Sequence, residues 1–356
     1  MSLSQIPEHA GEWLRGNGPH GEVVISSRIR YARNLAGFPF VHRANRRQQV
    51  EVMHLIKDEV QAQRLADNII WVDMAASPSL DRQLLVERHL VSRDLAAEKN
   101  DWPRGVVIAP DETFAAMINE EDHLRLQVLR SGMQLSEAFQ QIERLDNALE
   151  AGLEYAYSKR FGYLSACPTN VGTGLRVSVM LHLPALKLTG EIEKVRRAAR
   201  DTHLAVRGLF GEGSEALGDF YQVSNQSTLG KTEQEIVSDF EHTIVPQVIA
   251  YEQQARQALL KQRPAQLDDK IYRAWALLTH ARVLGTEEVL SLLSHLRLGV
   301  NLGRLTSVDL RTINELLLLT QPAHLQRLVG RTMDPAERKI ARADLVRQRL
   351  KPGGQG

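Results

Sequence analysis

The link between two short apolar segments constrains the fold more than any other feature of the sequence. Segments 105–109 and 113–119 are both apolar, and the three residues 110–112, Pro-Asp-Glu, are all that separates them. Parallel strands need a crossover of a dozen or more residues, so these two strands must run antiparallel. We therefore expect an α+β fold with a largely antiparallel sheet flanked by helices, rather than a doubly wound parallel sheet.

The chain divides into a mixed region and a helical region. Short segments rich in β-branched residues and bounded by Gly, Pro, Asp or Asn predict strands at 21–30, 68–74, 105–109, 113–119, 123–129, 175–183 and 217–224. Helical periodicity predicts helices at 43–64, 80–90 and 135–157, and after Lys231 at 232–262, 267–282, 286–298, 307–319, 322–330 and 335–350. The last helix has a clear start signal, with Asp334 as N-cap and Pro335 at the first helical position. We predict an N-terminal segment 1–20, an α+β domain 21–255 and an all-helical C-terminal domain 256–356.

Composition excludes several classes of protein. The net charge of +1 lacks the basic excess typical of a nucleic-acid binder. No apolar run approaches the roughly 20 residues of a membrane span. The N-terminus carries acids and no apolar core, so it does not read as a signal peptide. One cysteine excludes an internal disulfide framework and suits a reducing compartment, so we expect a cytoplasmic protein.

The common nucleotide-binding signatures are incomplete. Gly230, Lys231 and Thr232 look like the end of a P-loop, but that motif needs glycine at position 225, which is asparagine. The HRD and DFG motifs of protein kinases are absent, and so are HExxH and paired-cysteine metal motifs.

The single cysteine lies in a more informative motif, CPTNVGT at 167–173. A lone cysteine is more often a small buried apolar residue than a site residue. Cys167, however, lies in a Pro/Thr/Asn/Gly loop instead of an apolar run. The motif resembles the signature of the phosphagen (guanidino) kinases, such as creatine and arginine kinases.

Further blocks resemble the same family and follow in its order between about residues 20 and 255. They are SSRIR at 26–30, WPRG at 102–105, NEEDHLR at 119–125, GLRVSV at 174–179, RGLFGE at 207–212 and VSN at 223–225. The resemblance implies the catalytic-domain fold of phosphagen kinases and transfer of the γ-phosphoryl group of ATP to a guanidinium.

The layout of the chain departs from that of creatine and arginine kinases. Only 25 residues precede the SSRIR block, where those enzymes carry a helical domain, and a helical region follows instead. This layout is similar to that of the bacterial protein-arginine kinases, which phosphorylate arginine side chains in proteins. That resemblance implies a homodimer acting in stress response or in quality-control degradation, with a zinc-finger activator, a heat-shock repressor and a AAA+ protease as possible partners.

Arginines within these blocks are the candidates for binding a triphosphate. Guanidinium groups are always charged and grip phosphate oxygens in pairs, and phosphoryl transfer depends mostly on positioning and charge stabilisation. One arginine alone is usually a surface charge, but five within matching blocks favour a site: Arg28, Arg30, Arg125, Arg176 and Arg207. The resemblance extends the ATP site to Ser26, Ser27, Ile29, His89, Val177, Ser178, Val179, Met180, Gly208, Leu209, Phe210 and Gly211. For His89 the alternative is a residue that caps the end of a helix.

A guanidinium acceptor needs carboxylates to orient it and to accept its proton. We expect Glu121 to be the base and Glu212 a second clamp, with Glu215 as a weaker alternative to Glu212. Glu120 would face the other way on a strand and is expected to be solvated or structural. Cys167, as a thiolate, would contact the guanidinium electrostatically rather than act as a covalent nucleophile.

Magnesium is implied by ATP chemistry, and no acidic cluster looks like a complete protein cage for it, so no protein metal site is predicted. The protein-arginine kinases carry an RDxxRA motif that binds phosphoarginine near the C-terminus. Here the corresponding residues are Arg338, Lys339 and Arg342, so a lysine replaces the acid. Arg338 and Arg342 remain candidates, beside the plainer interpretation of an amphipathic surface helix.

Three functions stay open from the sequence. The leading one is an ATP-dependent protein-arginine kinase. The second is a phosphagen kinase acting on a free guanidino compound, and the third is a catalytically silent adaptor that binds phosphoarginine proteins.

Overall fold

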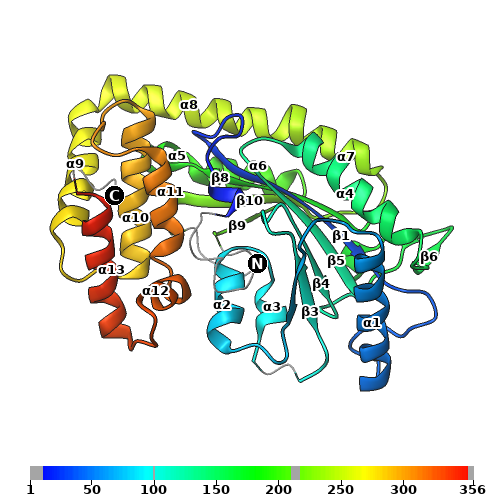
Figure 1. Ribbon diagram of the computed structural model, residues 1–356. Coiled ribbons are helices and arrows are strands. Elements are labelled where there is room, and N and C mark those ends of the chain that lie inside the picture. Colours follow the sequence, from blue (N-terminus) through cyan, green and yellow to red (C-terminus); the bar gives the residue numbers. More distant parts are fainter. Residues whose placement is uncertain (1–10, 99–100, 210–216, 352–356) are drawn as a thin grey trace.

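An eight-stranded antiparallel sheet forms the centre of the molecule (Figure 1). The computed structural model describes residues 11–98, 101–209 and 217–351. The strand order is β2-β3-β4-β5-β1-β8-β10-β9, and each neighbouring pair is antiparallel. The strands are β1 (Val24–Arg33), β2 (Ile70–Asp73), β3 (Gly105–Ile108), β4 (Phe114–Ile118), β5 (Leu124–Ser131), β8 (Leu175–His182), β9 (Leu204–Arg207) and β10 (Phe220–Asn225). The tight link between β3 and β4 is the one that the sequence required, and the antiparallel sheet is confirmed.

Some elements differ from the sequence expectation. The edge strand β9 was not predicted, because four residues with arginine at the end give little periodicity. Helices α5 (Pro184–Leu188) and α6 (Ile192–Asp201) were missed as well. A small hairpin of β6 (Tyr157–Ser158) and β7 (Gly162–Tyr163) follows α4 (Leu135–Glu150), which ends earlier than the predicted 157.

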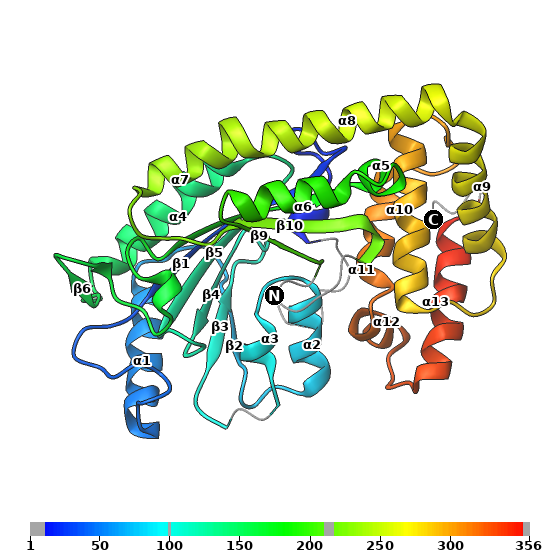
Figure 2. The ribbon, with the colours of Figure 1, turned by 180° about the vertical axis from the view of Figure 1, so that it is seen from behind.

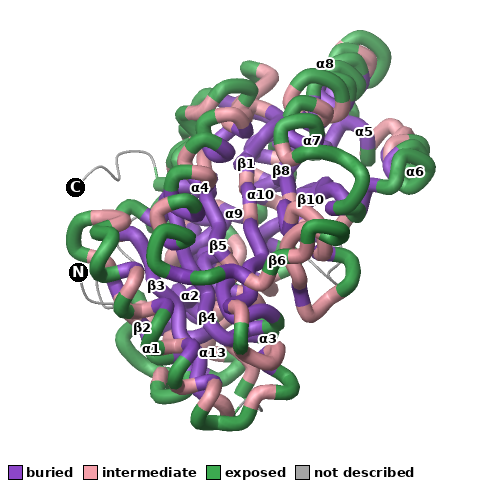
Figure 3. Tube along the Cα trace, turned by 90° about the vertical axis from the view of Figure 1, so that its right-hand side faces the viewer, coloured by how far each residue is buried: buried purple, intermediate pink, exposed green. Residues whose placement is uncertain are grey.

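Helices cover both faces of the sheet. Helix α4 packs across β1 and β5, and α6 packs on β9. At the β3–β4 end, α1 (Arg46–Ala62) lies on one side of the strands, while α2 (Ser79–Glu87) and α3 (Arg93–Ala96) lie on the other, as the two opposite views show (Figures 1 and 2). The central strands are therefore buried, whereas α6 and α8 turn an exposed surface outward (Figure 3).

The helical region after residue 231 is confirmed. Helix α7 (Glu233–Asp239), a π-helical turn (Phe240–Ile244) and α8 (Val245–Gln262) run on from one another and reach the C-terminal helices (Figure 1). Those helices are α9 (Pro264–His280), α10 (Thr286–Asn301), α11 (Leu310–Leu319), α12 (Pro322–Val329) and α13 (Pro335–Arg349). Asp334 caps α13 as expected, since its carboxylate accepts the backbone N–H of Glu337 at 2.8 Å. The proposed domain boundary at 255 falls inside α8.

Several hydrogen bonds join the C-terminal helices to the sheet domain, among them those of Glu87 and Asp219. The carboxylate of Glu87, the last residue of α2, accepts the backbone N–H groups of Ala323 and His324 at 2.8 and 3.0 Å at the start of α12. Farther along the interface, Ser294 of α10 donates to Asp219 at 2.7 Å and lies 2.9 Å from His182. No helix that the structure describes is long and apolar enough to cross a membrane.

A buried cation ties the sheet to α4. Arg33, at the end of β1 and 1% exposed, forms an ion pair with Asp146 of α4 at 2.7 Å. Its guanidinium carbon lies 3.7 Å from the ring centre of Tyr163 and 4.2 Å from that of Tyr31. Removing one partner of a buried ion pair leaves the other as an uncompensated charge, so this pair is a sensitive point of the fold.

Asp146→Ala is expected to lower the free energy of unfolding by about 3–5 kcal/mol, because Arg33 would stay buried with only the more distant carboxylate of Glu233, at 3.8 Å, as its ion-pair partner. Urea denaturation followed by circular dichroism measures the change. Arg311→Ala is the control, since Arg311 pairs with Glu315 at 3.1 Å while 84% exposed; its loss should cost less than about 0.5 kcal/mol. Equal losses in the two variants would contradict the structural role given to the buried pair.

Candidate active site

Strand register brings five arginines to one face of the sheet. Arg30 of β1 is opposite Arg176 of β8, and Ala32 of β1 is opposite Arg125 of β5. Arg207 of β9 is opposite Gln222 of β10, which in turn is opposite Met180 of β8. Directly opposed residues share a face and alternate residues repeat it, so Arg28, Arg30, Arg125, Arg176 and Arg207 all point to the same side.

This face of the sheet forms the floor of a pocket of about 720 Å³. Four of the five arginines line it, all except Arg28. The complete lining is Arg30, Tyr31, Ala32, Asp94, Trp102, Glu120, Glu121, Arg125, Cys167, Thr169, Asn170, Gly174, Arg176, Arg207 and Gln226. Four of the five predicted phosphate-binding arginines, the candidate base Glu121 and Cys167 are therefore in one cavity.

The arginines are crowded enough to disturb one another. Burial, together with Arg176, Arg125 and Arg207, lowers the pKa of Arg28 to about 10. Burial and three neighbouring arginines lower the pKa of Arg30 well below its usual range, although Glu120 raises it. The Nε atom of Arg30 is buried and has no hydrogen-bond partner among the residues that the structure describes. A polyanion would relieve the repulsion and supply the missing acceptor, so the residues fit a polyphosphate.

The turn between β4 and β5 supplies the carboxylates. Arg125 pairs with Glu120 at 2.6 Å and with Glu121 at 2.9 Å. Glu120 and Glu121 lie in the turn and not on a strand, so they do not face opposite ways, and both line the pocket. Glu120 is 7% exposed and accepts the Ser92 hydroxyl at 2.5 Å, so it is not the solvated acid that was one of the two expectations.

Glu121 combines access with an altered acidity. Its side chain is 46% exposed at the pocket, whereas that of Glu120 is 3% exposed. Burial raises the pKa of Glu121 above its usual value, as do Asp122 and Glu120, although Arg125 opposes the shift. A carboxylate that holds its proton more tightly is a better base than an ordinary surface glutamate. The geometry thus favours Glu121 over Glu120 for proton transfer.

Asp122, which the sequence did not single out, joins the carboxylate turn to the cysteine loop. The fully buried Asp122 accepts the amide of Asn34 at 2.7 Å and the backbone N–H of Ala166 at 2.8 Å. Ala166 directly precedes Cys167, so one carboxylate fixes the position of Cys167 relative to Glu121. The only signal in the sequence was its place in the NEEDHLR block, directly after Glu120 and Glu121.

The far side of the cysteine loop is held by segment 224–228. Thr228 donates its hydroxyl to the carbonyls of Thr169 and Val171 at 3.0 and 2.7 Å. Gly172 has φ +113°, and a Cβ there would lie 2.4 Å from the carbonyl oxygen of Thr228. Glycine is therefore required at 172 for conformation and for the close approach of the two backbones. The thiol of Cys167 lies 3.0 Å from the Thr169 hydroxyl.

The alternation of the strands divides the predicted ATP-binding residues into two groups. One group lies on the face of the sheet that carries the five arginines, here called the functional face. It lines a small cavity beside the main pocket and consists of Ser26, Arg28, Ser178 and Met180. The other group lies on the opposite face, in the core or in structural hydrogen bonds: Ser27, Ile29, Val177 and Val179. Ser27, for example, donates its hydroxyl to the carbonyl of Gly132 at 2.8 Å.

His89 lies directly beyond α2 and lines the same small cavity, so it both follows a helix end and faces the site. Burial and the nearby Arg28 and Arg93 lower the pKa of His89 to about 3, so the ring is neutral at physiological pH. Gly208 and Leu209 follow β9 and are buried. Phe210, Gly211, Glu212 and the alternative Glu215 lie outside the described residues.

Gln222 was not anticipated as a site residue. Its amide oxygen accepts Arg28 at 3.0 Å, while Arg28 also donates its Nε–H to Ser178 at 3.3 Å. These bonds hold the Arg28 guanidinium against the sheet. Nothing in the isolated sequence marks Gln222, because its place depends on the register between β8 and β10.

The C-terminal candidates lie in a different environment. Arg342 is 2% exposed and donates to the carbonyls of Thr320 at 2.7 Å and Leu284 at 2.9 Å. Arg338 donates to the carbonyl of Met333 at 2.7 Å. These bonds hold the C-terminal helices together. A phosphoarginine site at Arg338 and Arg342 stays a prediction that rests on sequence resemblance.

The described residues include no group of three or more His, Cys, Asp or Glu side chains that could hold a metal ion. The arginine side chains of the pocket can bind a polyanion. The carboxylates and the thiol at its rim can bind a cation. This is the arrangement that transfer of a phosphoryl group to a guanidinium requires.

Comparison with known proteins agrees with this geometry. The family model described as "ATP:guanido phosphotransferase, C-terminal catalytic domain" matches residues 51–255, and the model "Protein-arginine kinase McsB C-terminal domain" matches residues 264–355. The protein-arginine kinase of Halothermothrix orenii is 45% identical over 98% of this chain and 99% of its own length. That of Symbiobacterium thermophilum is 46% identical, also over 98% and 99%.

Solved structures show the same fold. Lombricine kinase is 30% identical with a TM-score of 0.57, and the match covers 67% of each chain. The duplicated taurocyamine kinase from Schistosoma mansoni, with bound transition-state-analogue components, is 27% identical with a TM-score of 0.60. That match covers 67% of this chain and 34% of the other. The phosphagen-kinase-like fold expected from the sequence is confirmed. The chain belongs to the ATP:guanido phosphotransferase family, as a member of its protein-arginine kinases.

Proposed function

We propose that the protein transfers the γ-phosphoryl group of ATP to the guanidinium of arginine side chains in proteins. One observation carries the proposal: a single pocket is lined by Glu121, Cys167 and the arginine floor, which consists of Arg30, Arg125, Arg176 and Arg207. The family supports the chemistry, because its members are kinases, and the relatives named protein-arginine kinase match over nearly their whole length.

The arginine floor would hold the triphosphate. Arg30, Arg125, Arg176 and Arg207 line the pocket from four different strands, so they can approach the phosphate oxygens from several sides. Charge that develops on the equatorial oxygens during transfer would then meet fixed cations, which costs no reorganisation at the moment of reaction. Magnesium bound mainly by phosphates and water would add charge neutralisation, which fits a site without a protein metal cage.

The rim of the pocket would hold the acceptor. A guanidinium is a poor nucleophile while it keeps all its protons, so Glu121 would orient it and accept a proton as the N–P bond forms. Cys167, which lines the same pocket, would contact the guanidinium electrostatically through its sulfur and would not act as a covalent nucleophile. Glu212 remains the proposed second clamp. Because Glu121 already pairs with Arg125, an incoming guanidinium would share or replace that partner.

Glu121→Gln is expected to lower kcat by at least about a hundredfold, because the amide cannot accept the proton. Phosphorylation of an arginine-rich protein should be followed by mass spectrometry before and after acid treatment, since a P–N bond is acid-labile. ADP binding should stay within about twofold of wild type, as the phosphate floor is intact. The exposed Glu137→Gln on α4 is the control. Wild-type rates for Glu121→Gln, or an acid-stable product, would refute this assignment.

The pH profile of kcat/KM should carry the signature of Glu121. Its carboxylate is the working form, so activity is present above its pKa and is lost as the pH falls through it. Because that pKa is raised, the acid limb should lie above the usual value of 4.5 for a glutamate. The residual activity of Glu121→Gln should lack this limb. A limb that persists unchanged in the variant would assign it to another group.

A protein-borne arginine is expected to be a better acceptor than the free amino acid. The Glu121 side chain is 46% exposed at the rim of the pocket. The relatives that match over nearly their full length are named protein-arginine kinase. Comparing kcat/KM for an unfolded arginine-containing protein with that for free arginine tests the point. A preference for free arginine would favour the alternative, a free-guanidino phosphagen kinase.

We further propose a cytoplasmic protein that acts as a homodimer in stress response or quality control, with the zinc-finger activator, heat-shock repressor and AAA+ protease as possible partners. These features rest on family resemblance. The non-catalytic adaptor is disfavoured, because a carboxylate with a raised pKa and an arginine floor in one pocket suit turnover better than simple binding.

A further inference from the structure

A second, small cavity lies beside the arginine pocket on the same face of the sheet. Its volume is about 10 Å³, and its lining is Trp13, Ser26, Arg28, His89, Leu129, Ser178, Met180 and Gln222. Arg28 in this lining is two residues from Arg30 in the main pocket, and Ser178 is likewise two residues from Arg176. One two-residue step along a strand is about 7 Å, so both cavities are within reach of a single nucleotide.

The lining of the small cavity has the chemistry of a nucleobase site. Leu129 and Met180 offer apolar contact, and the rings of Trp13 and His89 offer flat surfaces. The hydroxyls of Ser26 and Ser178 and the amide of Gln222 offer polar atoms for the edge of a base. Small-molecule sites typically combine apolar walls with a few placed polar groups in this way.

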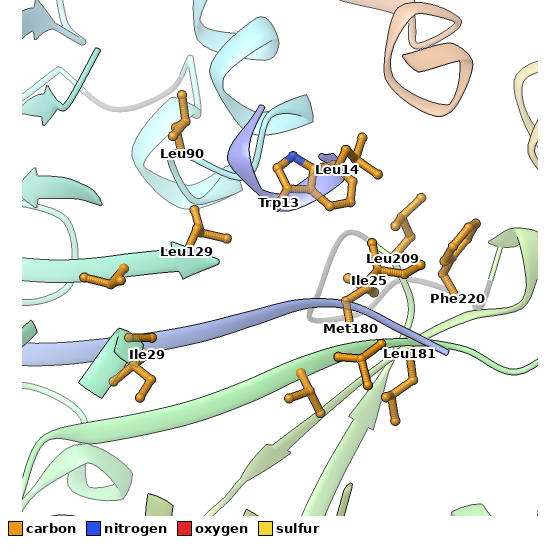
Figure 4. Packing of buried hydrophobic residues seen from close by; sticks show 14 of the residues in the cluster. Trp13, Leu14, Ile25, Ile29, Leu90, Leu129, Met180, Leu181, Leu209 and Phe220 are labelled. Carbon is orange, nitrogen blue, oxygen red and sulfur yellow. The ribbon is translucent and has the colours of Figure 1, made fainter. Parts of the chain in front are cut away.

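Trp13 comes from the segment before the first strand, which the sequence gave no reason to connect with the site. It lies over the functional face, above Leu129 of β5 and Met180 of β8 and beside the loop that carries Leu90 (Figure 4). Its ring meets that of His89 edge to face, with ring centres 4.5 Å apart. The indole is 5% exposed, and its Nε1 has no hydrogen-bond partner among the residues described, so packing alone holds the ring.

The backbone around Trp13 is fixed from two sides. The carbonyl of Leu14 accepts the amide of Asn314 in α11 at 3.0 Å. The backbone N–H of Gly16 donates to the Ser131 hydroxyl at the end of β5, at 2.9 Å. Leu14 is itself 1% exposed. The backbone that carries the indole is therefore anchored independently of the opposite wall of the cavity.

The opposite wall can move. The present volume holds no more than a water, so a base can enter after side chains rearrange. Arg28, Met180 and Gln222 are long and unbranched, and Gln222 is held by Arg28. If Arg28 turned towards a phosphate, it would give up its bond to Gln222, and both side chains would leave space beside the indole.

We infer that Trp13 is a base-binding residue: it forms the fixed wall of the nucleobase subsite, against which the purine packs once Arg28 has turned to the phosphates. This rests on the proposed ATP site. It makes the N-terminal segment a part of the nucleotide site and gives Trp13 a role in base recognition, separate from the role of the arginines in phosphate binding.

Titration calorimetry with ADP and with pyrophosphate, which lacks the base, tests the inference on the full-length chain. In Trp13→Ala, ADP affinity should fall about tenfold or more, as expected for loss of a base–aromatic contact. Pyrophosphate affinity should stay within about twofold of wild type. Trp13→Phe should recover most of the ADP affinity, and Trp275→Ala in α9 is the matched control that should change neither ligand.

The outcomes separate this inference from the proposed function. Unchanged ADP affinity in Trp13→Ala, or an equal loss for ADP and pyrophosphate, overturns the role of Trp13 and leaves the phosphate site standing. Failure of the wild-type chain to bind either ligand overturns both. If Trp13→Ala does not fold, ¹⁹F NMR of the 5-fluorotryptophan-labelled wild type serves instead. Among its four tryptophan signals, the one assigned through Trp13→Phe should shift with ADP and not with pyrophosphate; no shift with ADP overturns the inference.

Discussion

The concentration of five guanidinium groups on one face of a sheet is the constraint on which the rest of the structure depends. Burial first, and then repulsion between the like charges, lowers the pKa of Arg28 and of Arg30. The pleat makes the arrangement possible, because residues that alternate with the arginines point the other way into an apolar core. Ile29, Val177 and Val179 are essentially unexposed there. The same strands therefore provide the stability of the domain and the charge of its site.

The acidic turn between β4 and β5 balances this charge and organises the rim. Burial lowers the pKa of Arg125, but Glu120, Asp122 and Glu121 outweigh burial and raise it. Each acid then has a further task. Glu120 is anchored to Ser92, Asp122 holds the cysteine loop, and Glu121 alone keeps an exposed side chain. Three adjacent acids thus differ in role because their hydrogen-bond partners differ, which residue type alone does not reveal.

Local signals predicted much of the fold. The short β3–β4 link required an antiparallel pair, and Asp334 with Pro335 marked the start of α13. The four-residue edge strand β9 and the five-residue helix α5 escaped notice because they are too short to show a periodicity, and the amphipathic helix α6 was missed although its pattern is clear. For the site, motif resemblance selected segments that the structure brings to neighbouring cavities, but it did not separate Arg28 from its neighbours Ser27 and Ile29. That separation follows from period-two alternation, and it needs the register of the neighbouring strands to show which face is used.

Residues that act from far away in the sequence were the hardest to predict. Gln222 reaches Arg28 only because β10 pairs with β8, and Trp13 reaches His89 only because the N-terminal segment crosses the sheet. Both contacts are tertiary, and neither residue lies in a motif block that marks its role. Roles assigned to Glu212 and its neighbours remain predictions, since residues 210–216 lie outside the described part of the chain.

Helix α8 joins the sheet domain to the C-terminal helices without a linker. It spans Val245–Gln262 as one unbroken rod, so the point where one family model ends, residue 255, is mid-helix rather than in a linker. Its buried side chains contact both parts, with Glu252 accepting two backbone N–H groups of α5 at 3.2 and 3.0 Å. Cutting the polypeptide at residue 255 would expose buried apolar side chains of α8 on both fragments. The sheet domain and the C-terminal helices therefore share one continuous helix, and separating them by engineering would require a redesign of the surface that α8 buries.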